Sequence, residues 1–301
     1  MSINKNTVKL YNAPSDKAYM ILVYAFTALA TLIILVPLIF IVSASFSSPE
    51  ALLSAKVFLW PAEFTTRGYS MIIEHPTLMG GFVNSFTYAV VGTVVNVVMT
   101  ILAAYPLSRK DLGIRHVVMF LFAFTMLFNG GMIPTYLTVK NLGLLDTIWA
   151  MVLPNALAVW NVIITRTFFQ STIPDEMLES ASIDGCDDFQ FLMKMVIPLS
   201  VSIIAVNVLL YAVGHWNAYF NALMYLNKAE KYPLQLVLRD ILVQDDTAGV
   251  SMDVGKQIEK QKTRYLLQYS TIVIATVPVM LLYPLVQKYF VTGMMVGAVK
   301  G

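Results

Sequence analysis

Few residues in this chain of 301 are of the kinds that perform chemistry. The chain has three histidines and a single cysteine, Cys186. His75 and His116 fall in predicted loops while His215 falls in a predicted helix, so they do not have the spacing of a metal site. Cys186 has no histidine nearby in sequence to activate it as a nucleophile, and it is better explained as a small residue at a helix turn. These residues predict neither a catalytic centre nor a metal site.

Nucleotide chemistry is not predicted either. The sequence lacks a Gly-x-x-x-x-Gly-Lys-Ser/Thr phosphate loop, because Gly255-Lys256 has neither the earlier glycine nor the following hydroxyl. We therefore expect no enzyme activity and no cofactor in this chain.

The densest group of ionisable residues lies in the segment 170–198, between two apolar stretches. Its six carboxylates are Asp175, Glu176, Glu179, Asp184, Asp187 and Asp188. An amphipathic hairpin lying on lipid is one interpretation of this segment. An anionic membrane surface attracts basic segments instead, so the charge favours a protein partner.

Local signals predict a short helix in the first half of this segment. Thr172 can cap a helix whose first turn holds residues 174–176, a proline followed by two acids. Asp184-Gly185 ends that helix, since glycine readily takes the left-handed conformation.

A second helix is predicted to start at Asp187 or Asp188. Its apolar residues recur at helical spacing on one face: Phe189, Leu192, Met193 and Val196. Pro198 marks the change of direction into the next helix. Two short helices at a glycine elbow, between two long apolar segments, would make a rigid lever.

A second group combines amide, imidazole and indole side chains: His215, Trp216, Asn217 and Asn221. Helical spacing puts Asn217 and Asn221 on one face, where their amides could line a passage. The alternative is hydrogen bonding between packed membrane helices. The same alternatives hold, with packing favoured, for Asn84, Asn96, Asn155, Asn161 and Asn207.

The composition of the whole chain indicates the environment in which these residues lie. The chain is 57% hydrophobic and 13% charged, with a mean hydropathy of +0.69, far from the roughly 25% charge of a soluble domain. We therefore expect a membrane protein. The net charge of +2 is spread without a long basic run, so nucleic acid is not an expected partner.

Six segments are long and apolar enough to cross a membrane as helices, which predicts an all-α polytopic protein. They are 20–45, 82–108, 117–139, 148–169, 199–226 and 266–290. The third contains Asn129, Gly130, Gly131 and Pro134, so we expect it to be bent or packed inside a bundle.

Basic residues near the spans give the predicted topology. The full count of Lys and Arg is equal on the two sides, and the Arg109, Lys110, Arg115 cluster in a short loop places the N-terminus in the cytoplasm. The predicted organisation is a cytoplasmic segment 1–19, a six-helix permease domain 20–291 and a cytoplasmic tail 292–301. Within the domain, 170–198 is cytoplasmic and the loops 47–81 and 227–265 are external.

The cytoplasmic segment resembles the EAA motif of ABC importer permeases, Glu-Ala-Ala, two residues, Asp-Gly-Ala and a downstream Pro. Matching positions are Glu179, Ala181, Asp184, Gly185 and Pro198. Departures are Ser180 and Cys186, where the family has Ala, and Leu192, near where it often has Phe. The resemblance implies a type I importer permease in which this hairpin is the coupling helix that takes force from a cytoplasmic ATPase.

Further strings are similar to the carbohydrate branch of these permeases, including maltose-type members and those for oligosaccharides from complex polysaccharides. They are Asn84-Ser85-Phe86, Asn129–Tyr136, Asn141–Leu144, Trp216-Asn217, Pro233–Arg239 and Met294–Gly301. The resemblance implies that the chain forms half of a pathway for a sugar, and that His215, Trp216, Asn217, Asn221 and Asn84 are candidates to contact it.

The resemblance also implies the partners. They are a second related permease, two ATPase subunits that bind ATP and Mg, an extracellular substrate-binding protein and the bacterial cytoplasmic membrane. An ion-driven secondary transporter is the alternative, but it predicts carboxylates deep in the spans, and these spans hold almost none. A membrane enzyme would need an acid, base or metal cluster at one face, and none is apparent in the sequence.

Overall fold

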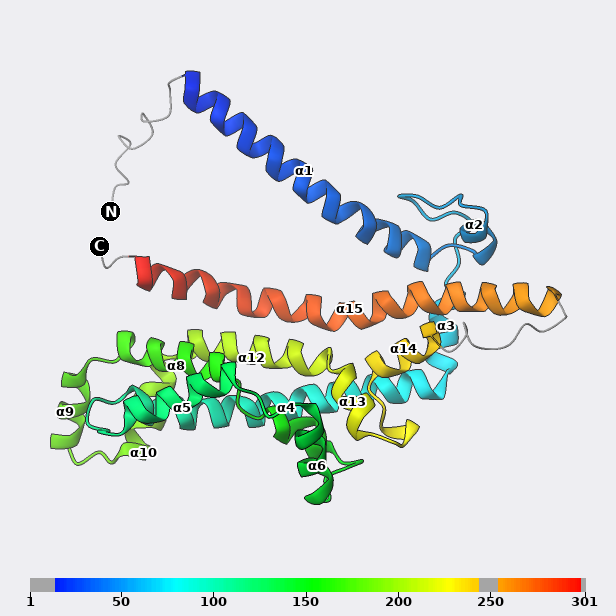
Figure 1. Ribbon diagram of the computed structural model, residues 1–301. Coiled ribbons are helices and arrows are strands. Elements are labelled where there is room, and N and C mark those ends of the chain that lie inside the picture. Colours follow the sequence, from blue (N-terminus) through cyan, green and yellow to red (C-terminus); the bar gives the residue numbers. More distant parts are fainter. Residues whose placement is uncertain (1–13, 244–253, 299–301) are drawn as a thin grey trace. The chain divides into compact units, whose positions relative to one another are not determined.

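The computed structural model describes residues 14–243 and 254–298, and every regular element in these ranges is helical (Figure 1). The α-helices are α1 Pro14–Ser45, α2 Pro49–Leu53, α3 Arg67–Glu74, α4 Pro76–Ser108, α5 Arg115–Leu127, α6 Met132–Asn141, α7 Ile148–Val152, α8 Val159–Thr172, α9 Asp175–Ile183, α10 Asp188–Phe191, α11 Ile197–Leu199, α12 Val201–Trp216, α13 Tyr219–Tyr225, α14 Leu234–Val243 and α15 Val254–Ala298. Short turns of other helical types are η2 Leu153–Asn155, the π-helical η3 Leu192–Val196, and η4 Ala229–Lys231. The all-α prediction is confirmed.

Three stretches of helix are each long and apolar enough to cross a membrane without a break: Asp16–Ser45, Pro76–Ser108 and Gln261–Gln287. Three further candidates are pairs of helices bent by 112°, 56° and 82° at short breaks: α5 with α6, α7–η2 with α8, and α10–α11 with α12. The bend expected in 117–139 from Asn129, Gly130, Gly131 and Pro134 is confirmed, since the break between α5 and α6 falls at residues 128–131. The breaks within 148–169 and 199–226 were not predicted, because apolar composition alone does not show where the backbone breaks.

One compact unit comprises Met1–Met71 and Gly249–Val273. Its small core is made by Ala44 at the end of α1, Ala51 in α2 and Val57 after it, and all three are buried. The ring of Phe40 meets that of Tyr269 edge-on, with centroids 5.9 Å apart. The predicted external loop 47–81 thus contains helical structure, and α15 begins inside the predicted loop 227–265.

The second unit, Ile72–Ala248 and Ile274–Gly301, contains the larger core. Here α4, α8 and α12 run lengthwise beside one another (Figure 1). Buried apolar side chains from all three helices form one cluster: Val97, Ile101, Tyr105, Val162, Phe169, Ile203 and Tyr211 among them. Because α4 contacts both other helices along much of its length, it is the central element of this unit.

Polar side chains within the bundle bond across it. Asn207 Nδ2 donates to Thr165 Oγ1 at 2.7 Å, joining α12 to α8, and Asn96 Nδ2 donates to the Asn155 carbonyl at 3.0 Å. The hydroxyls of Thr100 and Tyr211 lie 2.7 Å apart. These contacts support the packing alternative for Asn96 and Asn207, since amides commonly join packed membrane helices.

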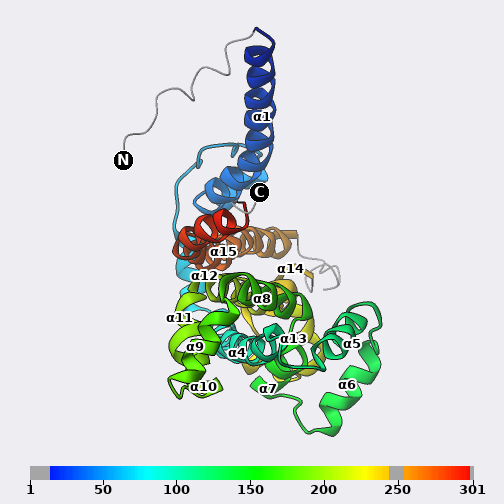
Figure 2. The same ribbon diagram turned by 90° about the vertical axis from the view of Figure 1, so that its left-hand side faces the viewer.

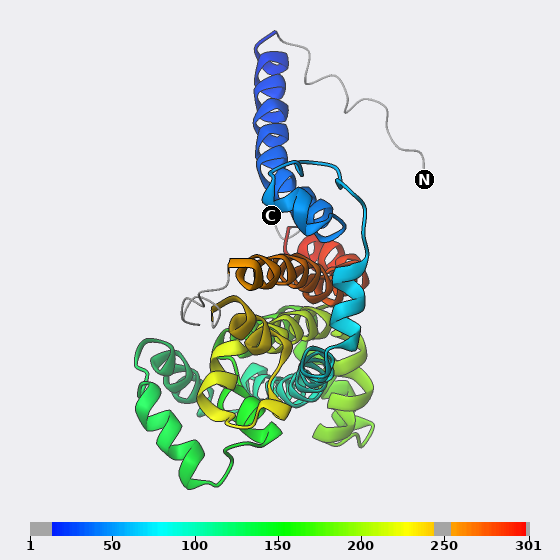
Figure 3. The ribbon, with the colours of Figure 1, turned by 90° about the vertical axis from the view of Figure 1, so that its right-hand side faces the viewer.

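The N-terminal end of α4 contacts the loop that leads into α14. Figure 3 shows α13 and α14 beside the N-terminal end of α4, and Gly81 permits this approach. A β-carbon at Gly81 would lie 3.2 Å from Leu234 Cα. The two ends of α4 are therefore built differently, one against the loop 226–234 and the other against α9 and α10.

Candidate functional site

The acidic segment folds as a two-helix hairpin, α9 and α10, with a glycine elbow. The Gly185 amide donates to the Ser182 carbonyl at 3.1 Å, and the Cys186 amide donates to the Ala181 carbonyl at 2.9 Å. This pair of bonds is a Schellman C-cap, which requires a left-handed residue, and Gly185 has φ +79°. The predicted stop at Asp184-Gly185 is confirmed, and Cys186 serves the turn through its main chain.

The second hairpin helix begins where the sequence predicted. Asp187 is the N-cap of α10, and its carboxylate accepts from the Gln190 amide at 2.7 Å. After Phe191 the chain makes the π-helical turn η3 and the short α11, which contains Pro198. The break before α12 falls at Ser200, two residues beyond Pro198.

Two details of the hairpin prediction are wrong. Thr172 does not cap α9, because α8 continues through it and Pro174 is the N-cap of α9. Phe189 and Met193 do not face the core, since both are exposed. The buried residues are Phe191, Leu192 and Val196, because the π turn shifts the register of the apolar face.

The hairpin is anchored by its inner face and exposed at its tip. Phe191, Leu192 and Val196 belong to the same buried cluster as Leu107 and Phe169 of the bundle, and Ala181 and Cys186 pack against that cluster. At the tip, Ile183 is 87% exposed and Phe189 is 67% exposed. Neither Glu179 nor Asp184 forms an ion pair with any residue in the described ranges. The tip thus offers apolar and acidic groups to solvent on a fixed support.

Side chains of neighbouring elements bind the last main-chain carbonyls of α4. An α-helix leaves its final carbonyls without intrahelical donors. Here three successive carbonyls are each bonded by a long polar side chain: Leu107 by Arg166 Nε at 2.8 Å, Ser108 by Gln170 Nε2 at 3.2 Å, and Arg109 by Arg115 Nη1 at 2.9 Å. The end of α4 is therefore fixed to α8 and to the start of α5.

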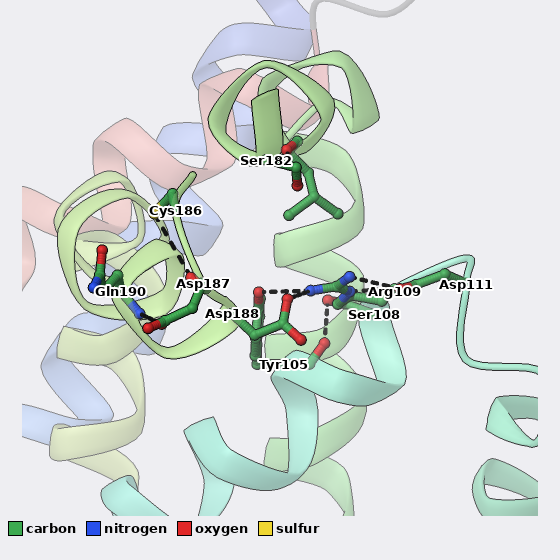
Figure 4. A network of polar contacts seen from close by, with 10 residues as sticks. Tyr105, Ser108, Arg109, Asp111, Ser182, Cys186, Asp187, Asp188 and Gln190 are labelled. Carbon is green, nitrogen blue, oxygen red and sulfur yellow. Dashed lines mark hydrogen bonds and ion pairs between the residues drawn. The ribbon is translucent and has the colours of Figure 1, made fainter. Parts of the chain in front are cut away.

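Two successive basic residues at this end of α4 contact the two hairpin helices. Arg109 Nη1 donates to Asp188 in the first turn of α10, and Lys110 Nζ donates to Asp175 in the first turn of α9. Figure 4 shows Arg109 between Asp111, Tyr105 and Asp188. Figure 2 shows α9 and α10 beside the end of α4.

The charges in this network shift one another's pKa values. The pKa of Arg109 is raised, chiefly by its hydrogen bond with Asp111, and the pKa of Asp111 is lowered, chiefly by Arg109. The pKa of Lys110 is raised by Asp175. These shifts favour the charged forms of Arg109, Lys110 and Asp111 at neutral pH.

A cleft of about 490 Å³ lies where α4, α8 and the hairpin meet. Phe169 and Phe191 line its apolar part, while Arg109, Lys110 and Asp175 line its polar part. Lys110 and Asp175 both line this cleft, so their ion pair joins the end of α4 to the first turn of α9 across it.

The predicted polar group around Trp216 does not form one helical face. Helix α12 ends at Trp216, Asn217 is its C-cap, and Asn221 lies in the separate helix α13. The prediction that Asn217 and Asn221 lie one turn apart on one helix is therefore wrong. Trp216 is buried and donates its indole N–H to the Ala275 carbonyl at 2.9 Å.

The other two candidates are also engaged within the protein. His215 is buried with its Nε2 directly beside Gly92 of α4. The amide of Asn84 donates to the carbonyls of Glu230 and Tyr232 at 2.7 and 3.1 Å. Asn84 thus holds the loop that precedes α14, and a role of any of these residues in contacting substrate stays a prediction.

Sequence reasoning missed two features that the structure brings together. The Ser85 hydroxyl accepts a hydrogen bond from the Leu234 amide at 2.8 Å. Asn84 and Ser85, at the start of α4, thus both bind the main chain of residues 230–234. Arg109 and Lys110 were noted only as topology signals. A basic pair that ends one span, together with an acid in the first turn of each hairpin helix, could have indicated the contact.

These features define a multi-pass helical membrane protein with a fixed hairpin between two spans. No protein-family model matches the chain. It is 41% identical over 287 residues to the polygalacturonan/rhamnogalacturonan transport system permease protein YtcP of Bacillus subtilis strain 168, an alignment that covers 95% of this chain and 99% of that protein. It is 27% identical over 248 residues to the melibiose/raffinose/stachyose import permease protein MelC of the same organism, with 81% of this chain and 84% of that one covered.

A solved transporter structure is also similar to this chain. A chain of a bacterial ABC transporter involved in the import of the acidic polysaccharide alginate matches with a TM-score of 0.84 and 34% identity, covering 92% of this chain and 98% of that one. The chain belongs to the family of ABC transporter permeases. It is a membrane subunit of an importer and not an enzyme, and such a subunit works with an ATPase and a substrate-binding partner.

Proposed function

We propose that this chain forms half of the pathway of an ATP-driven carbohydrate importer. A second related permease encloses the other half, two separate subunits bind ATP and Mg, and an extracellular binding protein delivers the sugar. The substrate class is an oligosaccharide, which is supported by the substrates in the names of the relatives above.

The proposed topology has six spans with both termini in the cytoplasm. This count is supported by three uninterrupted apolar stretches of helix and three bent pairs, each pair being taken as one span. Arg109, Lys110 and Arg115 lie at the same end of α4 as the hairpin, and basic residues are enriched on the cytoplasmic side of membrane proteins. The hairpin then faces the ATPase.

The observation that carries the coupling role is the contrast between the two faces of the hairpin. Phe191 and Val196 are built into the bundle core, whereas Ile183 and Phe189 are exposed at the tip. A partner that binds the tip would move the bundle with it, as in rigid-body rocking between inward-open and outward-open states. Glu179, Ser180, Ala181, Asp184, Gly185, Cys186 and Pro198 form or flank this lever.

Disrupting the tip tests this role. Ile183→Asp places a charge where an apolar contact is proposed, and it leaves the core untouched because the side chain is exposed. We expect the variant chain to lose co-purification of the ATPase and uptake of trigalacturonate, alginate trisaccharide or raffinose, whichever the wild-type complex carries. Ile114→Asp, an exposed isoleucine in the neighbouring loop, is the matched control. If Ile183→Asp retains ATPase binding and uptake, the coupling role is wrong.

A further inference from the structure

The end of α4 has two ion pairs with the hairpin, and they differ in how firmly they are held. The Arg109 side chain is only 18% exposed, whereas that of Lys110 is 74% exposed. Ion pairs between fully exposed side chains contribute little, since solvent screens them and ordering both side chains costs entropy. The Arg109–Asp188 pair is therefore the stronger candidate for a mechanical link.

Arg109 is also held in one orientation by other partners. Its guanidinium makes two hydrogen bonds with Asp111, at 2.9 and 2.5 Å, and one with the Tyr105 hydroxyl at 3.2 Å. A planar guanidinium bound on several sides has little freedom, so the second N–H of Nη1 is directed at Asp188. Among the residues that the structure describes, the Lys110 ammonium is bonded by Asp175 alone.

We propose that Arg109 is a positioning residue that transmits hairpin movement to α4 through Asp188, with Lys110 as a dispensable second contact. This inference rests on the proposed function. It adds the route by which force leaves the hairpin: Asp188 to Arg109, then along α4.

The route continues to the opposite end of the subunit. Asn84 and Arg109 lie 25 positions apart on or at the end of one unbroken helix, which is about 38 Å at 1.5 Å per residue. At the Asn84 end, α4 holds the main chain of residues 230–234 through Asn84 and Ser85. A movement of the hairpin is thereby linked to the loop 226–234 on the other face.

The test compares variants of the whole importer complex in proteoliposomes, by the ratio of ATP hydrolysis rates with and without the binding protein. That ratio reports whether a signal crosses the subunit, which a purely structural residue would not change in well-assembled complexes. We expect Arg109→Gln and Asp188→Asn each to lower the ratio about fivefold, the upper range for a partly exposed pair. Arg109→Lys, which keeps the charge but loses the paired hydrogen bonds with Asp111, restores only part of it.

Controls make the result specific. Lys110→Gln and Asp175→Asn leave the ratio within about twofold of wild type. The double variant Arg109→Gln with Asp188→Asn is no worse than either single variant, because both remove one link. Asp188→Asn removes that link from the exposed partner, whose side chain is 74% exposed, so the core that supports assembly is unchanged.

Hydrogen–deuterium exchange in the same complexes supplies a second measurement. Amides of 188–196 exchange faster in Arg109→Gln and Asp188→Asn than in Lys110→Gln. A wild-type ratio in both Arg109→Gln and Asp188→Asn would overturn the proposed role of Arg109 but not the proposed importer function. A wild-type complex whose ATP hydrolysis does not respond to the binding protein would instead contradict the proposed function.

Discussion

The imidazole of His215 occupies the space that a β-carbon on Gly92 would need. An added β-carbon would lie 2.4 Å from His215 Nε2, well inside van der Waals contact. This glycine therefore sets how closely α12 approaches α4, the helix that joins the hairpin to the loop 226–234. Small residues commonly permit such close helix packing in membranes.

Replacing Gly92 tests this relationship. We expect Gly92→Ala to destabilise the subunit by about 1–3 kcal/mol, the usual cost of overpacking, as measured by thermal unfolding of the purified complex in detergent. The double variant Gly92→Ala with His215→Ala should recover stability because the clash is removed. Gly80→Ala is the matched control, since it lies in the same helix with open space at its β-carbon. Equal effects at positions 80 and 92 would contradict the clash.

The elbow of the hairpin gives a second prediction. Gly185 has φ +79° and no atom within 4 Å of an added β-carbon, so a substitution there meets backbone strain but no steric clash. Gly185→Ala should cost about 1 kcal/mol and accelerate amide exchange in α9 and α10, while Gly185→Asn should cost less, since Asn tolerates this conformation. Gly113→Ala, in an exposed loop with open space, serves as control. An Asn variant that is worse than the Ala variant would argue against the Schellman cap.

The role of Asn84 can be separated from substrate contact. Asn84→Ala removes two donated hydrogen bonds, each worth about 0.5–1.5 kcal/mol, so we expect faster proteolysis of the segment 227–233. Thr87→Ala is the control, because its hydroxyl bonds only within its own helix. If Asn84→Ala raises the KM for uptake without any change in proteolysis, Asn84 contacts substrate instead of holding the loop.

The ion pairs at the end of α4 predict a broad pH plateau. The folded-state pKa of Asp111 lies below its ordinary value of 3.8, so its stabilising effect is present above that value and is lost as pH falls through the lower folded pKa. The pKa of Lys110 is raised above 10.5, so its contribution is present below 10.5 and is lost as pH rises through the folded pKa. Amide exchange of the hairpin, corrected for intrinsic rates, should therefore be constant between about pH 5 and 9. A transition near neutral pH would show that another group controls the contact.

Local signals in the sequence predicted the hairpin well. Gly185 ends α9 and Asp187 caps α10 because each acts within a few residues of itself, which a sequence shows directly. The error at Thr172 has a tertiary cause: α8 runs through this residue. The π turn at Leu192–Val196 likewise changes which apolar residues are buried.

The sequence did not predict features that depend on packing or on contacts between residues far apart in the chain. Apolar length pointed to the helical stretches that are apolar enough to cross a membrane. The breaks at Ser200 and Asn217 depend on how the helices pack, so Asn217 and Asn221 were wrongly placed on one helix. The contact between Arg109 and Asp188 joins residues 79 positions apart. The basic pair and the acids of the hairpin could have indicated a contact between the two segments, but their local patterns do not specify which basic residue meets which acid.

The bend at Ser200 has a mechanical consequence. The rod from Asp188 to Leu199 meets α12 at 82°, so the two pieces form nearly a right angle. The rod contains 12 residues, which at 1.5 Å per residue gives an arm of about 18 Å. A push on the hairpin along the direction of α12 therefore acts as a torque about Ser200 and tends to tilt the bundle. If the rod continued straight into α12, the same push would only be transmitted along the helix axis.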